Sequence, residues 1–233
     1  MEQFQEETPV LDIPVDYPRP QERSIEGSVL TALLDENICE GIHCIAQKTG
    51  TTDYMVFLAT LMVTLSKYSR QEDIVIGCPV SGKMHKDAAE MFENTLPMRG
   101  KPAKEKMFTE FLLEVKETCL KAYENQEYPF EMLVEDIDIH RDMSRNPLFD
   151  VMLTLQNNED ADIGFDGTRA EDNGAGSCVA KLDLAFIVVE TNDTFGVMLE
   201  YCTRLFKRET AEYILMHYVE TLRQVCGDMN FRK

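Results

Sequence analysis

Apolar side chains recur at helical spacing in several stretches of the chain. This spacing places them on one face of an amphipathic helix. It predicts helices over residues 35–48, 107–125 and 208–226, and a short helix that opens at Pro129. Residues 54–68 are apolar nearly all round, which indicates a helix buried at the centre of the fold.

Other stretches follow the patterns of β-strands. Residues 73–80 form a short apolar run between turn signals, which is typical of a strand buried on both faces. From Leu148 onward the period changes to two. In this pattern Phe149 and Val151 share the apolar face of a strand, and Asp150 lies on the polar face.

The last strands of the chain predict a hairpin. Residues 182–190 and 194–202 are strand-like, and Asn192-Asp193 between them tolerates the positive φ of a tight turn. Residues 24–30 and 91–98 are expected to form two further strands. Strands and helices therefore alternate, which predicts an α/β fold with a mixed sheet flanked by helices.

Two stretches differ in composition from the rest. Residues 1–23 are polar and acidic and contain four prolines, so they are expected to be an extended linker. Residues 157–180 are rich in Gly, Asn and Asp, which predicts a mobile loop. The chain has 233 residues and is 44% hydrophobic, enough for one domain with a substantial core or for two small ones.

Charge and cysteine usage narrow the function classes. Acidic residues outnumber basic ones by 42 to 23, so nucleic acid and anionic membrane surfaces are excluded as partners. No segment is long and apolar enough to span a bilayer, and no signal-peptide pattern is present. Seven cysteines without a C-x-x-C indicate reduced thiols in the cytoplasm, with no metal site. Cys78, in a buried strand, is interpreted as a structural thiol rather than a nucleophile.

Three motifs give the chain a family resemblance. N-Q-E-Y-P-F-E at residues 125–131 and R-D-M-S-R-N-P-L-F at 141–149 closely resemble the last two signature motifs of nonribosomal peptide synthetase condensation domains. M-F-E-N-T-L-P-M-R at 91–99 resembles the preceding motif, G-x-F-V-N-T-x-x-x-R. Their order and spacing are those of the family. Glu93 departs from it, because a valine is usual there.

The family's active-site motif, H-H-x-x-x-D-G, is absent from this sequence. None of the four histidines is doubled or followed by D-G at that spacing. The chain therefore resembles the second lobe of a condensation domain without its first. The resemblance implies one lobe of the chloramphenicol-acetyltransferase-like (CoA-dependent acyltransferase) fold, with a linker over 1–23 and the C-terminal lobe over 24–233. It also implies that 157–180 is a latch, expected to be disordered or paired with a neighbouring molecule when the other lobe is missing.

The resemblance implies an activity for the parent domain. An acceptor amine on one peptidyl carrier protein attacks a thioester on another, and both reactants arrive on phosphopantetheine arms. The histidine that interacts with the amine is not in this chain, so the chain is expected to bind no cofactor and to be inactive alone. The implied partners are the N-terminal lobe, the donor and acceptor carrier proteins and an adjacent adenylation domain, with self-association through the exposed cleft face as a further expectation.

The motifs also suggest site residues. Asn94 and Arg99 are expected to line or support the shared cleft, with Arg99 holding the active-site aspartate of the other lobe; the alternative for Arg99 is a surface charge at a strand end. The other motif residues are expected to shape loops, with Asp142 and Arg145 as an ion pair. These are Gln126, Pro129, Arg141, Asp142, Arg145 and Asn146.

Two other function classes remain open. The first is a non-catalytic module that binds a carrier protein or a neighbouring domain. The second is half of a related epimerisation or cyclisation domain. The form R-D-M-S-R-N-P-L-F favours condensation over both, because that form belongs to condensation domains.

Overall fold

The computed structural model describes residues 2–4, 8–83, 91–137, 142–157, 178–191 and 194–228. In chain order the elements are η1 (Glu2–Phe4), β1 (Glu26–Leu33), α1 (Glu36–Thr49), α2 (Asp53–Ser69), β2 (Ile74–Lys83), β3 (Met91–Gly100), α3 (Phe108–Glu124), α4 (Phe130–Asp136), β4 (Val151–Asn157), β5 (Cys178–Val179), β6 (Leu184–Thr191), β7 (Thr194–Cys202) and α5 (Arg208–Gly227).

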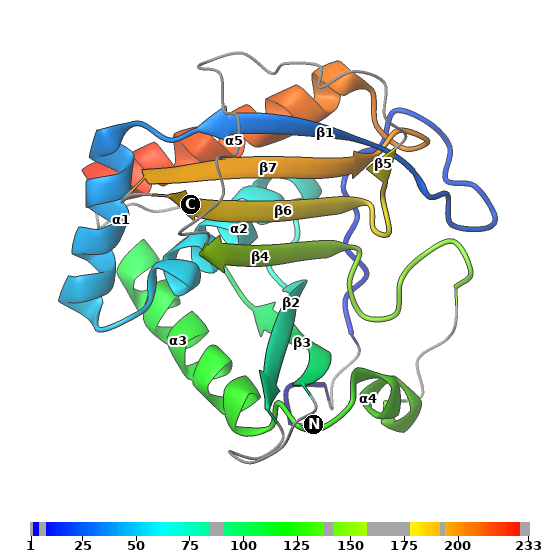
Figure 1. The fold of residues 1–233 in the computed structure, drawn as a ribbon, viewed down its shortest axis with the longest axis horizontal. Coiled ribbons are helices and arrows are strands. Elements are labelled where there is room, and N and C mark those ends of the chain that lie inside the picture. The colour runs from blue at the N-terminus through cyan, green and yellow to red at the C-terminus, as the bar shows by residue number, and fades with distance from the viewer. Residues whose placement is uncertain are drawn as a thin grey trace.

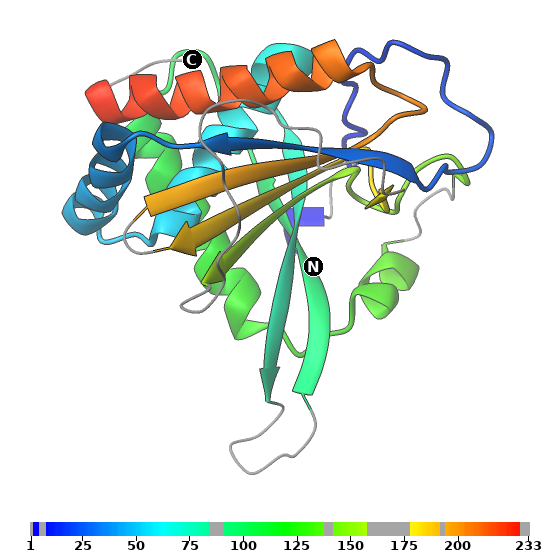
Figure 2. The same cartoon turned by 45° about the horizontal axis from the view of Figure 1, so that its top comes forward.

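The strands form one mixed sheet, in the order β3-β2-β4-β6-β7-β1-β5. Strand β4 is parallel to β2 and β6, whereas the other neighbours are antiparallel. Helices α2, α3 and α5 pack together on the sheet, with α2 in contact with both others, and α4 lies apart beside β3 (Figures 1 and 2). This arrangement confirms the predicted α/β fold with a mixed sheet flanked by helices.

Helix α2 is the centre of the core, as its sequence predicts. Every residue from 55 to 66 is buried. Thr52 caps the N-terminus of the helix by accepting a hydrogen bond from the backbone N–H of Met55. The aromatic ring of Phe57 packs edge-on against Phe195, with ring centroids 5.0 Å apart, and its carbonyl accepts a hydrogen bond from Tyr218.

The two amphipathic helices α1 and α5 bury the predicted faces. In α1 the buried side chains include Ile38, Ile42 and Ile45. The buried side chains of α5 are Ala211, Ile214, Leu215, Tyr218, Thr221, Leu222 and Val225. His43 is partly buried, because its Nδ1 lies 3.0 Å from the Asp53 carboxylate and its ring centroid lies 5.2 Å from that of Phe195.

The N-terminal segment is more firmly held than a linker pattern suggests. Residues 8–23 contain no helix or strand, as predicted, but Leu11 and Ile13 are buried in the main core, and Phe4 of η1 is buried in a second cluster beside α4. The isolated apolar residues among its polar neighbours attach it to the core. Strand β2 also runs beyond the predicted end at residue 80, since residues 81–83 pair with β3.

The strand predicted from Leu148 begins later, at Val151. Leu148 has a positive φ of 70°, which breaks the alternation of side chains before the strand starts. As a result Phe149 packs in the second cluster, with its ring centroid 5.3 Å from that of Phe130, while Val151 joins the main core. Asp150 is buried, which contradicts its predicted place on a solvated face.

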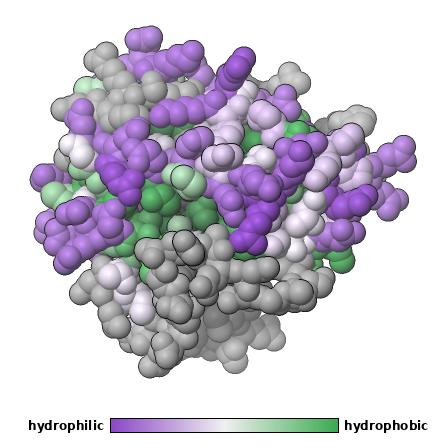
Figure 3. All heavy atoms as spheres, turned by 90° about the horizontal axis from the view of Figure 1, so that it is seen from above, coloured by the Kyte–Doolittle hydropathy of each residue, from purple (hydrophilic) through white to green (hydrophobic). Residues whose placement is uncertain are grey.

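The expected hairpin of β6 and β7 is confirmed by antiparallel pairing that extends to Thr191 and Thr194; its turn lies outside the described residues. Most of the predicted latch, residues 158–177, also lies outside them. Its last residues form β5 and pair with β1 of this chain. Figure 3 shows hydrophilic side chains over most of the described part of the face seen from above, with apolar ones gathered in a band near its middle.

Candidate functional site

Asn94 joins β3 to the turn that precedes α4. Its side-chain amide donates hydrogen bonds of 2.8 Å to the carbonyls of Gln126 and of Tyr128. Its side-chain oxygen accepts hydrogen bonds from the backbone N–H groups of Thr95, at 2.9 Å, and of Phe130, at 3.0 Å. Because both ends of the amide are used within this chain, Asn94 fixes the start of α4 as a helix cap would.

The two residues predicted to shape this turn lie beside Asn94. Gln126 contributes its carbonyl to the Asn94 amide. Pro129 occupies the N-cap of α4, one position earlier than predicted, and its carbonyl accepts a hydrogen bond from the N–H of Leu133 at 3.1 Å. Proline offers no side-chain acceptor for a helix N-terminus, so the oxygen of Asn94 takes that place from a neighbouring strand.

Arg99 is buried and paired, so the alternative of a surface charge is wrong. Its side chain is 6% exposed, and it donates two hydrogen bonds to the carboxylate of Asp73, from Nε at 2.9 Å and from Nη2 at 2.7 Å. A third bond of 2.6 Å runs from Nη1 to the carbonyl of Gln3, and the guanidinium lies 6.0 Å from the ring centre of Phe4. A bidentate contact of this kind fixes the plane of the guanidinium.

The motif loop at residues 142–150 is shaped by its own side chains. Asp142 accepts hydrogen bonds from the N–H of Ser144 at 2.8 Å and from its hydroxyl at 2.7 Å, and these bonds lower the pKa of the Asp142 carboxyl. Arg145 pairs with Asp150 and not with Asp142, which corrects the predicted ion pair. Arg141 lies outside the described residues.

Asp150 is the acceptor around which the loop folds. Besides Arg145 it accepts a hydrogen bond from the N–H of Asn146 at 3.2 Å, and Asn146 in turn accepts one from Arg23 at 2.9 Å. Burial raises the pKa of Asp150, the nearby Asp183 carboxylate acts in the same direction, and Arg145 opposes them. Sequence reasoning missed Asp150. The available signal was a carboxylate directly after the motif, five positions after Arg145.

A groove of about 520 Å³ lies beside this loop. Its walls come from residues 8–11, from α4 and from the motif loop, and Phe130, Val134 and Phe149 give it an apolar lining. Glu131, Glu135 and Asp142 add acidic groups to it. Neither Asn94 nor Arg99 belongs to this lining. The structure therefore brings the motif loop and α4 together but leaves the two predicted cleft residues outside the groove.

The described residues contain no group of three metal-ligating side chains close enough to hold a metal ion. Burial raises the pKa of the Cys78 thiol to about 11, so this residue is a protonated structural thiol, as predicted. None of the helices within the described ranges is long and apolar enough to cross a membrane.

Comparison with known proteins identifies relatives over almost the whole chain. The family model described as "Condensation domain" matches residues 1–232. The chain is 46% identical to bacitracin synthase 3 of Bacillus licheniformis over 225 residues, which are 95% of this chain and 4% of that protein. It is 44% identical to tyrocidine synthase 2 of Brevibacillus parabrevis over 231 residues, 98% of this chain and 6% of that protein. The chain thus spans only a small part of these relatives.

Solved structures share the fold. The X-domain in its complex with OxyB from teicoplanin biosynthesis matches with a TM-score of 0.85 at 24% identity, covering 99% of this chain and 52% of that one. A four-domain nonribosomal peptide synthetase bound to AMP and glycine matches with a TM-score of 0.84 at 24% identity, covering 97% of this chain and 18% of that one. The condensation domain of the monacolin K polyketide synthase matches at 0.79 and 17% identity, covering 98% of this chain and 55% of that one.

Proposed function

The chain belongs to the condensation-domain family of nonribosomal peptide synthetases, and from this premise we propose that it is the C-terminal lobe of one such domain. The observation that carries the proposal is how much of this chain and of each related chain aligns. The chain aligns over nearly all of its own length but only about half of the X-domain and monacolin K chains. Its motifs are the last three of the family, and the H-H-x-x-x-D-G motif of the first half is not in its sequence.

The parent domain would form an amide bond between two tethered substrates. The acceptor amine attacks the thioester carbonyl of the donor, the C–N bond forms, the C–S bond breaks, and the donor's phosphopantetheine thiol leaves. Such a reaction depends mainly on holding two reactants in register and on stabilising the charge that develops at the carbonyl oxygen. The phosphopantetheine arms belong to the carrier proteins and reach the reaction as parts of the substrates.

In this proposal the lobe supplies shape and support rather than the reacting histidine. Asn94 fixes α4 against β3. Arg99 supports the active-site loop of the other lobe, with the plane of its guanidinium fixed by the bidentate contact with Asp73. The partners are the N-terminal lobe, the donor and acceptor peptidyl carrier proteins and an adjacent adenylation domain, all in the cytoplasm. Alone, the chain does not catalyse condensation.

The test is amide formation between aminoacyl groups loaded on two carrier proteins, followed by mass spectrometry of the released product. The chain alone is expected to give no dipeptide, and the chain joined to its upstream lobe is expected to give it. A histidine variant of the upstream motif is the control for background aminolysis.

Each other outcome contradicts a different part of the proposal. Dipeptide formation by the chain alone contradicts the missing-lobe assignment. Inversion of an aminoacyl thioester without amide formation by the joined protein indicates an epimerisation domain. Carrier binding without either reaction indicates an interaction module.

A further inference from the structure

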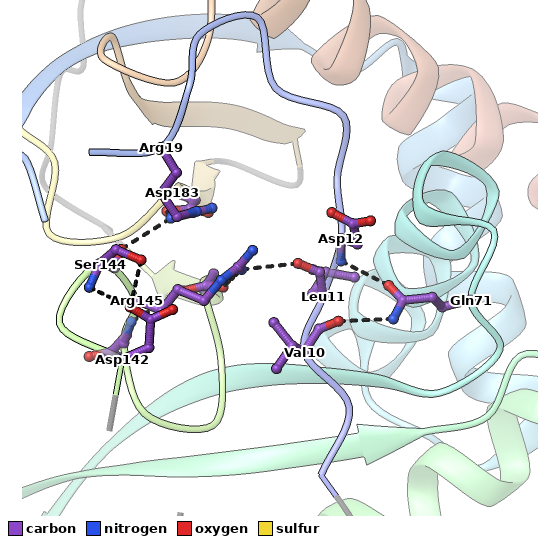
Figure 4. A network of polar contacts seen from close by, with 11 residues as sticks. Val10, Leu11, Asp12, Arg19, Gln71, Asp142, Ser144, Arg145 and Asp183 are labelled. Carbon is purple, nitrogen blue, oxygen red and sulfur yellow. Dashed lines mark hydrogen bonds and ion pairs between the residues drawn. The ribbon is translucent and has the colours of Figure 1, made fainter. Parts of the chain in front are cut away.

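Residues 10–23 cross the lobe in an extended path that is fixed at several points (Figure 4). At one end the side chain of Gln71 forms two hydrogen bonds with the backbone of this segment. Its oxygen accepts a hydrogen bond of 2.9 Å from the N–H of Asp12, and its amide donates one of 2.9 Å to the carbonyl of Val10. These two bonds act on the segment as a neighbouring strand would. Leu11, between them, is buried.

At the other end Arg19 binds the carboxylate of Asp183 with both terminal nitrogens. The bond from Nη1 to Oδ1 is 2.9 Å long, and Nη2 contacts Oδ2. Nη1 also donates to the carbonyl of Ser144 at 3.2 Å. The side chains of Arg19 and Asp183 are 18% and 14% exposed, so this is a largely desolvated pair between segments 164 residues apart.

The motif loop contacts the same segment. Arg145, while paired with Asp150, donates a hydrogen bond of 3.2 Å to the carbonyl of Leu11. The N–H of Arg23 donates to the carbonyl of Met143 at 3.1 Å. The loop that carries the family motif therefore lies against the segment and holds its backbone.

Asp150 and Asp183 explain why the segment and the motif loop each place an arginine here. They lie at the starts of the neighbouring parallel strands β4 and β6, and the N–H of Asp183 donates to the carbonyl of Asp150 at 3.1 Å. The Asp150 carboxylate is buried, that of Asp183 is partly buried, and the charge of Asp183 acts on Asp150, so the two repel each other unless cations neutralise them. Arg145 of the loop supplies one cation and Arg19 of the segment supplies the other.

We propose that Asp150 and Asp183, acting through Arg145 and Arg19, are positioning residues that fix the path of residues 10–23 over the lobe. One of the two cations belongs to the segment. Neutralisation of the Asp150 and Asp183 carboxylates is therefore coupled to docking of the segment. This positioning role adds to the proposed function, and its consequence for the position of the first lobe rests on that function. In the parent domain this segment joins the first lobe, so the two pairs set where that lobe lies relative to Asn94 and Arg99.

The first test needs only this chain. Arg19→Gln removes the cation and shortens the side chain, while it keeps a polar end. Hydrogen exchange is followed at the amides of Asp16 and Tyr17, which bond to the carbonyl of Leu205 at 2.9 and 3.2 Å, and at that of Arg23. We expect their exchange to accelerate about tenfold or more, since a charge-assisted contact is lost, while the amides of β6 and β7 keep their rates.

Two further variants make the result specific. Asp183→Arg alone should accelerate exchange as Arg19→Gln does, and the double variant Arg19→Asp with Asp183→Arg should restore protection. Arg223→Gln, which removes two exposed ion pairs, with Asp35 and with Glu220, is the matched control and should leave the segment unchanged. Unchanged exchange in the single variants overturns the proposal. So does equal acceleration throughout the protein, or a double variant that fails to restore protection.

A second test addresses the consequence separately. In the chain joined to its upstream lobe, Arg19→Gln is expected to lower the kcat of dipeptide formation about tenfold and to leave the KM for both loaded carriers unchanged. The charge-exchanged double variant should recover kcat. A wild-type joined protein that forms no dipeptide contradicts the proposed function. In that case hydrogen exchange on this chain still tests whether the two ion pairs hold residues 10–23. An active joined protein that tolerates Arg19→Gln, despite a loosened segment, overturns the link to lobe position.

Discussion

Asn94 offers a direct contrast between a cleft-lining residue and a structural one. The informative change is Asn94→Ala, which deletes both ends of the side-chain amide and adds nothing to the site. A residue that only faces a cleft can be truncated at little cost to folding. A residue that holds the start of α4 against β3 cannot.

The magnitude follows from the four hydrogen bonds of Asn94. The bonds to the carbonyl of Gln126 and from the N–H of Phe130 are partly buried, whereas that to the carbonyl of Tyr128 is exposed and the one from Thr95 is local. At about 0.5–1.5 kcal/mol for each partly buried bond and less for the others, the loss is about 2–3 kcal/mol. Water can reach the groups left behind, which keeps the value in this range.

Urea unfolding measures this loss as a decrease in the free energy of unfolding. Exchange of the Phe130 amide should also accelerate, because its acceptor is removed. Asn94→Asp keeps the acceptor oxygen but loses the two donors, so it should fall between Asn94→Ala and the wild type. Asn125→Ala is the matched control, since it loses a single exposed bond to the carbonyl of Lys121. The reasoning is refuted if Asn94→Ala costs no more than Asn125→Ala.

Three further changes test other parts of the structure. Gly77→Ala should lower the free energy of unfolding by about 1–3 kcal/mol in urea, because its Cβ would lie 2.4 Å from the ring of Phe149. Arg99→Met should cost about 2–3 kcal/mol in the same assay by leaving Asp73 without its bidentate partner. Burial raises the pKa of Cys78 from 9.0 to about 11, so the unfolded chain loses this proton first as the pH rises. Relative to Cys78→Ala, the wild type should therefore lose up to about 3 kcal/mol of unfolding free energy between pH 9 and 11, measured by urea titration at each pH.

Each of these changes has its own control. Gly227→Ala, with no atom within 4 Å of the added carbon, should shift stability by less than about 1 kcal/mol, and an equal loss at both glycines would contradict the close contact. Adding Asp73→Asn to Arg99→Met should recover part of the lost stability, and no recovery would contradict the pair. If the wild type and Cys78→Ala lose stability in parallel above pH 9, the buried thiol is not the cause.

The helices and strands could be predicted from sequence because burial of one face makes apolar residues recur at a regular spacing. The unbroken apolar run of α2 predicted its central position, and the helical spacing of the apolar residues in α5 predicted its buried face. The β6–β7 hairpin was predicted by two strand patterns joined at a turn. In each case the information lies within one segment, so no knowledge of its partners is required.

The details of the motif loop could not be predicted in this way. Arg145 had carboxylates on both sides within reach, and the choice of Asp150 depends on the positive φ of Leu148. Leucine gives no signal for that conformation. The pair of Arg19 with Asp183 joins distant segments, and only the fold brings them together. Arg99 has the form of a strand-end charge, but the segment around Gln3 and Phe4 buries it.

The central claim is that this chain is the second lobe of a condensation domain whose catalytic histidine lies in a first lobe. The most direct measurement is the coding sequence immediately upstream of Met1 in the native gene. We expect an H-H-x-x-x-D-G motif in the same reading frame, followed by a chain that continues into residues 1–23. A start codon at Met1 with no such motif in the adjacent sequence would contradict it.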